Sequence, residues 1–457
     1  RALPRKGAPH DHGNGPNFFN KEAKKSMNKK MNIRALIFRV ADAALRMGGG
    51  GRRFRRVLSS LRRERPANEA QLKKILKWST ENVAFYEAYR GFRGLEDFPV
   101  VNKTVIRENE ARIFARGVDK AKLHKVSTSG STGTPFVVWH DKKKRRQAAA
   151  DTMAFSEFAG YHFGTRLYYV RAWDGVLVRG NWYSKLRNIV PVNNRSLTPE
   201  DFRRFLKTLE EDASEKSVLI YASTLTELFR FMKTENVRTT ARVQAFITMS
   251  EALPDDVREG VSALFGAPVV SRYSDCECGL IAQQAPGEKE YRVNTESFFV
   301  EILKTDSDER AADGELGRIV VTDLYNSAMP IIRYDTGDMG VMETRGDAKT
   351  LTRVDGRRID FVFSTRGELL SPYVFYGVMR TFDEIRQYQF VQHAEKNYVM
   401  KLNIPGGAFP RAADLREQLL SLVGEDADLK FEYVNEIPTL ASGKRKFVVN
   451  NWQPKKT

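Results

Sequence analysis

The chain has 457 residues, 41% of them hydrophobic, which is enough apolar material for roughly two to four folding units. Its 28 Phe, 16 Tyr and 5 Trp require burial and exclude a fully disordered chain. Two cysteines, Cys276 and Cys278, exclude a disulfide-stapled secreted scaffold and suit a reducing cytoplasm, and no uncharged apolar run reaches the ~18 residues of a membrane span.

The positive charge is concentrated at the N-terminus. The formal net charge is +18, and residues 1–65 hold 18 Lys and Arg against 4 Asp and Glu. The remaining residues carry 57 basic against 53 acidic side chains, so the main body is close to neutral. We therefore interpret residues 1–66 as a basic arm that is partly disordered.

Within this arm, residues 1–26 are rich in Gly, Pro, Asn and Lys and are expected to be disordered, with Met27 or Met31 as candidate native starts. Apolar residues at helical spacing predict a helix over residues 31–47, which the glycines at 48–51 end. The basic amphipathic stretch 31–65 can lie on the inner face of an anionic membrane, bind nucleic acid phosphates or remain a solvated arm. We favour the solvated arm, then peripheral membrane contact. Nucleic acid is the least favoured partner because aromatic residues are sparse.

A helical pattern from Asn68 to Asn82 opens the main body, and strand-like runs then alternate with helical ones as far as Asp323. This alternation predicts an α/β fold in which sheets are flanked by helices. The expected strands are 167–170, 218–221, 245–249 and 268–273, and the expected helices are 202–209, 226–232 and 256–265. We assign residues 67–356 to a large N-terminal domain and residues 357–457 to a small α+β domain.

The most informative segment is the Ser/Thr/Gly-rich loop Thr128–Thr134. Small hydroxyl residues and two glycines let backbone amides and hydroxyls turn inward around an anion. The loop lacks the Gly-Lys-Ser/Thr of a Walker A motif, and Phe136–His140 after it has a strand pattern, so a hairpin is expected to carry it. An ordinary polar hairpin turn is the alternative.

Further motifs follow in a fixed order, and together they resemble the adenylate-forming ligases. They are the lead-in segments 82–86 and 98–103, the loop at 128–134, Met249–Leu253, Arg272–Glu277, Arg333–Asp338, Gly356–Asp360 and Ser442–Lys444. Within that superfamily the chain is most similar to the branch of phenylacetate–CoA ligase and CapK-like capsule-biosynthesis enzymes. The resemblance covers residues 67–450 and leaves the basic arm outside it.

The resemblance implies an adenylate-forming N-terminal domain and a mobile α+β lid domain, with ATP and Mg²⁺ as cofactors and CoA as a candidate co-substrate. It assigns the β- and γ-phosphates of ATP to the loop residues Thr128, Ser129, Gly130, Ser131, Thr132, Gly133 and Thr134. Ser250 and Glu251 fall in a second nucleotide-binding segment.

In the fourth motif, Glu277 is expected to bind Mg²⁺, a hard cation that prefers carboxylate and phosphate oxygens. Its alternative is a surface glutamate after a strand. Tyr273 and Ser274 are expected beside the adenine and the α-phosphate, although Tyr273 alone fits a core aromatic equally well.

Three later residues complete the implied site. Asp338 is expected to accept both ribose hydroxyls, as acidic residues do in dinucleotide folds, with a plain Asp-containing turn as its alternative. Arg357 is expected to reach the ribose or phosphate, or to be half of a solvated Arg357–Arg358 pair. Lys444 is expected to be catalytic and to point from the lid at the reacting oxygens, or to belong to a solvated lysine-rich loop.

The sequence departs from the family pattern at three places. Thr134 stands where many members have lysine, Cys276 lies in a Ser-Asp-Cys-Glu segment where Gly-x-Thr-Glu is usual, and Ile359 replaces an acidic residue or lysine. Cys276 and Cys278 lack the further ligands of a closed zinc site and are interpreted as core or pocket-lining thiols.

These observations favour a ligase that uses ATP and Mg²⁺ to convert a carboxylic acid into its acyl-adenylate. By resemblance, the acyl group then passes to CoA, a carrier thiol or an amino sugar, in a role that includes surface polysaccharide biosynthesis. The alternative is a non-catalytic, basic-armed scaffold on a nucleotide-binding fold. The walls of the acid pocket are expected around Trp173, Trp182, 221–223 and 245–246.

Overall fold

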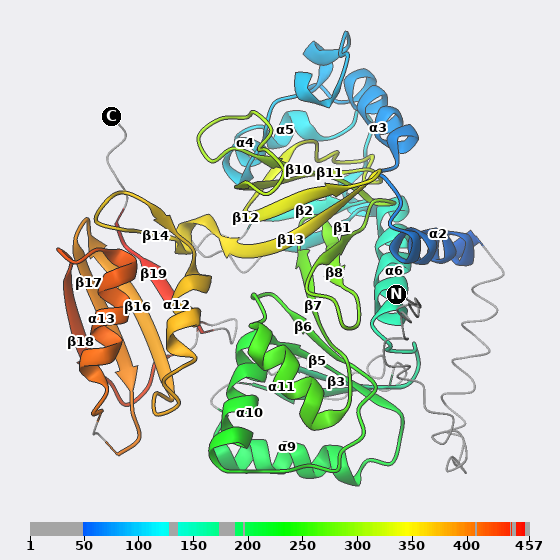
Figure 1. The fold of residues 1–457 in the computed structure, drawn as a ribbon. Helices are drawn as coiled ribbons and strands as arrows, with labels where there is room; N and C mark the ends of the chain where they lie inside the picture. The colour runs from blue at the N-terminus through cyan, green and yellow to red at the C-terminus, as the bar shows by residue number, and fades with distance from the viewer. Residues whose placement is uncertain are drawn as a thin grey trace, which may run out of the picture.

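A large sheet and a separate small sheet organise the chain, as the computed structural model shows (Figure 1). It describes residues 49–127, 136–172, 188–194, 197–406, 409–438, 440 and 445–452. The loop Thr128–Thr134, Lys444, the helix expected at 31–47, Trp173 and Trp182 lie outside the described residues. The domain boundaries at 66/67 and 356/357 remain predictions.

Eleven strands of the described chain form the large sheet in the order β10-β11-β12-β13-β9-β8-β7-β6-β5-β3-β4. The strands from β7 to β4 in this order are parallel, and all other pairs are antiparallel. The parallel strands are β3 (Arg166–Arg171), β4 (Ile189–Asn193), β5 (Lys216–Tyr221), β6 (Phe246–Met249) and β7 (Val269–Asp275). The others are β8 (Gly279–Gln284), β9 (Tyr291–Val293), β10 (Phe298–Leu303), β11 (Leu316–Asp323), β12 (Tyr334–Arg345) and β13 (Ala348–Arg357).

Helices cover both faces of the parallel half, which explains why β6 is buried along its whole length. On one face lie α9 (Pro199–Glu211), α10 (Ala222–Thr234) and α11 (Asp255–Phe265), which share an apolar core with the sheet. At the other face is the C-terminal end of α6 (Lys142–Phe158), where Ala159 packs in a cluster with Leu167 and Val270. The strands and helices expected between residues 167 and 273 are all confirmed.

The N-terminal elements pack on the antiparallel half (Figure 1). They are α3 (Glu69–Asn82), α4 (Lys103–Glu108), α5 (Glu110–Ile113) and short 3₁₀ turns at Glu87–Tyr89, Leu95–Asp97 and Lys120–Lys122. Asn68 caps α3 by accepting the Gln71 amide at 3.1 Å. The strands β1 (His124–Ser127) and β2 (Val137–His140) pair antiparallel, so the expected hairpin on either side of the loop is confirmed.

The C-terminal part forms its own sheet with its own core, as predicted for a small α+β unit. The order is β18-β17-β16-β19, with β16 and β17 antiparallel and the two outer pairs parallel. A 3₁₀ turn, Arg358–Asp360, leads into it. Its elements are β14 (Val362–Phe363), β15 (Leu369–Leu370), α12 (Pro372–Met379), β16 (Gln387–Ala394), β17 (Asn397–Asn403), α13 (Ala412–Val423), β18 (Asp428–Tyr433) and β19 (Val448–Asn450).

Gly49–Gly51 form the first turn of α2 (Gly49–Arg63), so these glycines do not interrupt helical structure as a break would. Whether the run ends a helix over residues 31–47 lies outside the described residues. Glycine is a poor helix former, but the helix buries Phe54, Val57 and Leu61 against α6. This tertiary burial outweighs the local preference for a break, and it makes part of the predicted arm an integral layer of the body. No helix of the described residues is long and apolar enough to cross a membrane.

Buried polar side chains of α6 form a network with Ser297, and this network allows a test of the core. Asp151 accepts hydrogen bonds from Ser297 Oγ at 2.8 Å and Gln147 Nε2 at 3.1 Å. Burial raises the pKa of Asp151 to about 6, although the ammonium of Lys144 opposes the rise. Because an unfolded aspartate titrates near pH 4, the folded state holds this proton more tightly than the unfolded chain.

We therefore expect Asp151→Asn to abolish one component of the pH dependence of stability. The asparagine keeps the acceptor oxygen and removes the titration. The melting temperature of the parent protein, relative to the variant, should fall as the pH rises from about 4 to about 6 and be constant above that. Thermal unfolding of both proteins between pH 4.5 and 7.5 measures this difference, and a difference independent of pH would contradict the assignment.

Candidate functional site

The candidate site lies at the junction of the parallel and antiparallel halves of the large sheet, near the middle of the molecule (Figure 1). Here β7 ends, the turn 275–279 leads into β8, and β12 and β13 bring residues from the other half. In open α/β sheets the crevice outside the carboxyl ends of parallel strands is where ligands bind. Four of the predicted site residues meet at this edge.

Asp338 is the centre of the first cluster. Its carboxylate accepts a hydrogen bond from Tyr273 Oη at 2.9 Å and forms an ion pair with Arg357 Nε at 3.1 Å. Arg357 is directly opposite Asp338 in the β12–β13 register, so strand pairing fixes that contact. Burial raises the pKa of Asp338, while Arg357 and the Tyr273 hydroxyl counteract the rise. Tyr273 is therefore more than a core aromatic, because its hydroxyl group binds Asp338.

Glu277 is the centre of the second cluster. The side chain is 2% exposed, which excludes the interpretation as a surface glutamate. Its Oε1 lies 2.7 Å from Lys103 Nζ and accepts a hydrogen bond from Tyr334 Oη at 3.0 Å. Its backbone carbonyl oxygen lies 2.9 Å from His140 Nε2.

Lys103 and Tyr334 are contacts that sequence reasoning missed. Both lie inside motifs that carry the family resemblance, and Lys103 follows Asn102, which caps α4 by accepting the amides of Thr104 and Val105. That cap was a local signal that the chain turns at this point. It does not reveal that the lysine reaches a glutamate 174 positions later, because the contact depends on how α4 packs on the sheet.

Asp275 adds a third buried carboxyl group. Its Oδ1 accepts the backbone amides of Cys278 at 2.6 Å and Gly279 at 3.1 Å, which closes the turn between β7 and β8. Burial and then repulsion from Glu277 raise its pKa to about 7. Its Oδ2 is buried and has no hydrogen-bond partner among the described residues. The site is therefore rich in negative potential, with Lys103 and Arg357 on its border.

The fit of this site to Mg²⁺ can be judged from its donors. No group of three or more His, Cys, Asp or Glu side chains within the described ranges is arranged to hold a metal by itself. Mg²⁺ usually binds one or two carboxylates and takes its other ligands from water and substrate phosphates. Glu277 and the unpaired Oδ2 of Asp275 fit a metal that arrives with a nucleotide.

Ser250 and Glu251 lie at the end of the neighbouring strand β6. Ser250 has φ +71°, a left-handed backbone conformation that residues other than glycine rarely adopt. Such conformations cluster at functional sites. Glu251 accepts the amide of Ser223 in the first turn of α10 at 2.9 Å, which places a carboxylate at the positive end of the helix. Ser274 is half-buried, and its backbone pairs with Leu280 of β8.

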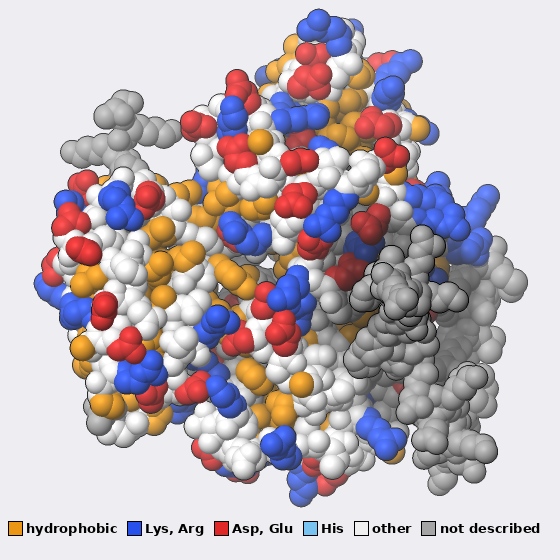
Figure 2. All heavy atoms as spheres, viewed as in Figure 1, with side chains coloured by type: hydrophobic (Ala, Val, Ile, Leu, Met, Phe, Trp, Pro, Cys, Tyr) orange, Lys and Arg blue, Asp and Glu red, His pale blue; other side chains and the backbone are white. Residues whose placement is uncertain are grey.

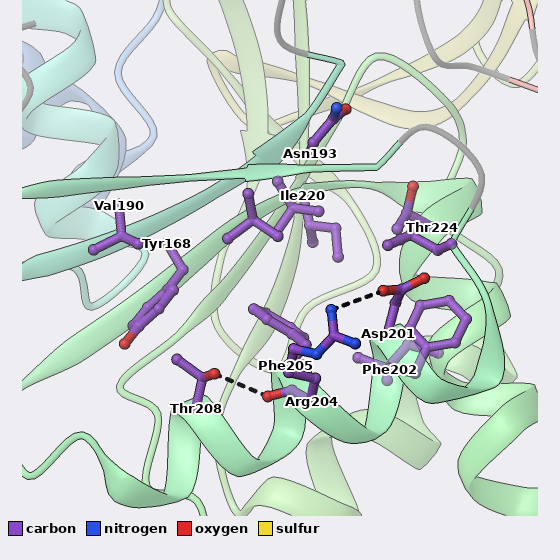
Figure 3. A pocket seen from close by; sticks show the side chains of 14 residues that line it. Tyr168, Val190, Asn193, Asp201, Phe202, Arg204, Phe205, Thr208, Ile220 and Thr224 are labelled. Atoms are coloured by element: carbon purple, nitrogen blue, oxygen red, sulfur yellow. Dashed lines mark hydrogen bonds and ion pairs between the residues drawn. The ribbon is translucent and has the colours of Figure 1, made fainter. Parts of the chain in front are cut away.

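A cavity of about 210 Å³ lies apart from this site, between α9 and the face of β3, β4 and β5 that this helix covers (Figure 3). Tyr168, Val190, Ile220 and Phe205 line it, and Arg204 pairs with Asp201 at its rim at 3.3 Å. None of the predicted nucleotide-binding residues lines it. It lies on the α9 face of the parallel strands, so we do not place the reaction there.

Comparison with known proteins agrees with the geometry. The family model "CapK C-terminal domain" matches residues 362–451. Protein CapK of Staphylococcus aureus is 25% identical over 373 residues, which cover 78% of this chain and 80% of CapK. Phenylacetate-coenzyme A ligase of Thermus thermophilus is 26% identical over 313 residues, which cover 62% of this chain and 67% of that enzyme.

The chain is thus similar to the adenylate-forming ligases, and its relatives come from the branch that the motifs indicated, the one with CapK and phenylacetate–CoA ligase. The match of residues 362–451 to the CapK C-terminal domain agrees with this. A solved structure of 2-hydroxyisobutyryl-CoA ligase, in the postadenylation state in complex with R3-HIB-AMP, has the same fold. Its TM-score is 0.63 at 16% identity, covering 84% of this chain and 88% of that chain.

The Lys103–Glu277 contact can be tested by a double-mutant cycle. Lys103→Met leaves the buried carboxylate of Glu277 without its cation and should destabilise the protein by about 1–3 kcal/mol. This is less than the cost of breaking a fully buried pair, because the Lys103 side chain is 28% exposed. In a Glu277→Gln background the same substitution should have little effect. Lys120→Met, which removes an exposed pair with Glu110, is the matched control.

Thermal and urea unfolding of the four proteins of the cycle measure the coupling. Additive effects of the two substitutions would show that Lys103 and Glu277 do not form a pair in solution.

Proposed function

We propose that this protein uses ATP and Mg²⁺ to activate a carboxylic acid as its acyl-adenylate and then transfers the acyl group to CoA. The observation that carries the proposal is the meeting of Tyr273, Asp338 and Arg357 beside the Glu277–Lys103 pair, at the ligand-binding edge of the sheet. The relatives that share this fold are ligases by name, which supports the acid–thiol ligase class.

Adenylation joins a substrate carboxylate oxygen to the α-phosphorus of ATP and breaks the bond from that phosphorus to the bridging oxygen of pyrophosphate. The reaction needs positioning and charge stabilisation more than covalent help from the protein. Mg²⁺, when bound, neutralises phosphate charge. Asp338 accepts the ribose hydroxyls and holds the sugar, and the Tyr273 hydroxyl and Arg357 keep that carboxylate oriented.

The Glu277–Lys103 pair prepares the site for a charged nucleotide. Without a ligand, the ammonium of Lys103 compensates the buried carboxylate of Glu277 at 2.7 Å. Glu277 would hold Mg²⁺, which would supply positive charge to the phosphates, and Lys103 would then be free to contact the phosphate oxygens. The Lys103 ammonium of α4 would then supply the positive charge that many family members supply by a lysine at the position of Thr134. The loop residues 128–134 and Lys444 are proposed to complete the phosphate contacts.

The acceptor is the next question, and CoA is the choice best supported. Phenylacetate–CoA ligase and 2-hydroxyisobutyryl–CoA ligase carry CoA in their names. A carrier thiol or an amino sugar, and with them a role in surface polysaccharide biosynthesis, rest on the relationship to CapK alone.

Exchange of labelled pyrophosphate into ATP, dependent on an added acid, measures the adenylation step. Asp338→Asn and Lys444→Ala should each lower this exchange by roughly 10²–10³-fold, because each removes charge that acts on the bound nucleotide or the transition state. Asp313→Asn and Lys430→Ala, which alter exposed pairs with Thr344 and Asp428, are the matched controls. Exchange that is absent with every acid would favour the non-catalytic scaffold, and exchange that is unaffected in both variants would contradict the roles of Asp338 and Lys444.

We also propose that the basic face around α2 makes peripheral contact with an anionic membrane at the inner face. The apolar side of α2 is buried against α6, so this helix cannot insert into lipid by that side. Its arginines Arg52, Arg62 and Arg63 are exposed, and Figure 2 shows Lys and Arg side chains gathered over α2. Contact by this face is therefore electrostatic.

Cations of two other helices adjoin this face. Burial and then repulsion from Lys74 of α3 lower the pKa of Lys143 of α6, and Arg53 of α2 contributes to the repulsion. Three helices thus bring positive charge to one surface. Such a patch attracts phosphate-bearing headgroups and loses that attraction as salt rises.

Sedimentation with vesicles tests this contact. The protein should bind vesicles that contain phosphatidylglycerol at 50 mM salt, about tenfold less at 300 mM, and not bind pure phosphatidylcholine. Replacing Arg52, Arg62 and Arg63 together by glutamine should weaken binding and leave pyrophosphate exchange unchanged. Binding that is insensitive to salt, or equal on neutral vesicles, would contradict an electrostatic contact.

A further inference from the structure

A row of four side chains crosses the parallel strands at their carboxyl ends. Strand register aligns Tyr221 of β5 with Met249 of β6 and Arg272 of β7. Arg171 of β3 extends this row, because the preceding pair in the register is Val170 with Ile220. Side chains alternate between the two faces of a strand, so the row lies on the face away from α9. The cavity of Figure 3 is on the other face, where Tyr168, Val170 and Ile220 point.

Arg272 is the unusual member of the row. Its Nε donates a hydrogen bond to Gln283 Oε1 at 2.9 Å, and the Gln283 amide nitrogen donates in turn to the Phe155 carbonyl oxygen. That second bond fixes the amide with its oxygen toward the guanidinium. The Nη2 atom of Arg272 is buried and has no hydrogen-bond partner among the described residues.

No carboxylate of the described chain compensates this charge. The buried arginines Arg333 and Arg318 differ in this respect, because Arg333 pairs with Glu301 and Arg318 with Asp335. For Arg272, burial lowers the pKa to about 10, and only Tyr169 opposes that change. A desolvated cation without a counter-ion destabilises a fold, and its place near the carboxyl ends of parallel strands, where ligands bind, indicates a ligand-binding role.

The row is also next to the reacting centre. Tyr273 follows Arg272 and points to the opposite face, where it contacts Asp338. Ser274, two residues along the strand and roughly 7 Å from Arg272, is expected beside the α-phosphate. If the carboxylate of the acid reacts at the end of β7, the other end of a short acid can reach the Arg272 guanidinium. Arg171 is three strand spacings away, roughly 14 Å, too far to share a small group with Arg272.

We propose that this row forms the floor of the acid pocket and that the acid carries a second anionic group, a carboxylate in the simplest case, which binds Arg272. This inference rests on the proposed function and narrows its substrate class to short acids with an anionic distal end. Tyr221 and Met249, both buried, form the apolar middle of the floor. Arg272 acts as a specificity-determining residue and takes no part in the bond changes.

Matched pairs of acids test the inference. Succinate against butyrate and glutarate against valerate differ only in whether the distal end is a carboxylate or a methyl group. In acid-dependent pyrophosphate exchange, the parent protein should favour the dicarboxylate of each pair by roughly 10²-fold or more. The reason is that the bound monocarboxylate leaves the Arg272 guanidinium without a partner.

Arg272→Met should lower activity with the dicarboxylate by a similar factor and leave or raise activity with the monocarboxylate. Arg272→Lys should restore part of the preference, and it remains informative if the methionine variant folds poorly. Arg366→Met, which removes an exposed arginine paired with Glu368, is the matched control. A purely structural role for Arg272 would lower exchange with both acids equally and would overturn the inference.

Direct binding separates this inference from the proposed function. In calorimetry and thermal-shift measurements, dicarboxylates should bind the parent protein and not Arg272→Met, whether or not exchange occurs. Dicarboxylate binding without any exchange would refute the ligase function and retain the anion site. Exchange that prefers monocarboxylates, or dicarboxylate binding equal in the parent and the variant, would refute the anion site and retain the ligase.

Discussion

The turn between β7 and β8 is the constraint on which the candidate site depends. Asp275 ties the amides of Cys278 and Gly279 to one carboxylate oxygen, and Gly279 has φ +109°, which side chains rarely adopt. The tight turn reverses the chain exactly where the parallel half of the sheet ends, and it forces Glu277 inward. With Glu277 buried, Lys103 and Tyr334 have a fixed partner, and three remote segments are drawn to one edge of the sheet.

The electrostatics of this edge are unbalanced in a way that favours a charged ligand. Glu277, Asp275 and Asp338 are desolvated together, and repulsion from Glu277 contributes to the raised pKa values of the other two. Lys103 and Arg357 compensate only part of that charge. Under the proposed function, a nucleotide with its metal ion would satisfy both kinds of group, because the carboxylates would hold the metal and Lys103 and Arg357 would contact the phosphates. The surrounding core keeps water from this charge, since Tyr334, which donates a hydrogen bond to Glu277, is fully buried.

Local patterns predicted the layout well and tertiary contacts poorly. The alternation of strands and helices from 167 to 273 and the hairpin around the glycine-rich loop follow from short-range periodicity, and both are confirmed. The predicted meeting of Tyr273, Asp338 and Arg357 came from the order of motifs in a family, not from spacing. The start of α2 at Gly49 was missed because its stability comes from burial against α6, which no local pattern encodes. Lys103 and Arg272 escaped for the same reason: a lysine at a helix start and an arginine in a strand acquire meaning only through what surrounds them.

The contacts of the C-terminal part show how a lid could be both held and released. Lys233 of α10 pairs with Asp383 at 2.6 Å, Tyr376 donates to Asp256 of α11 at 2.8 Å, and Arg445 pairs with Glu227 of α10. Lys233 and Asp383 are more than half exposed, so water can replace this pair at little cost. Arg445 follows the proposed catalytic Lys444 in the sequence, and it pairs with α10, whose Ser223 amide binds Glu251 beside the site. Release of the small sheet would break this mostly buried Arg445–Glu227 pair and separate Tyr376 from the apolar cluster around α9, α10 and α11, so the two parts are held more firmly here than at Lys233.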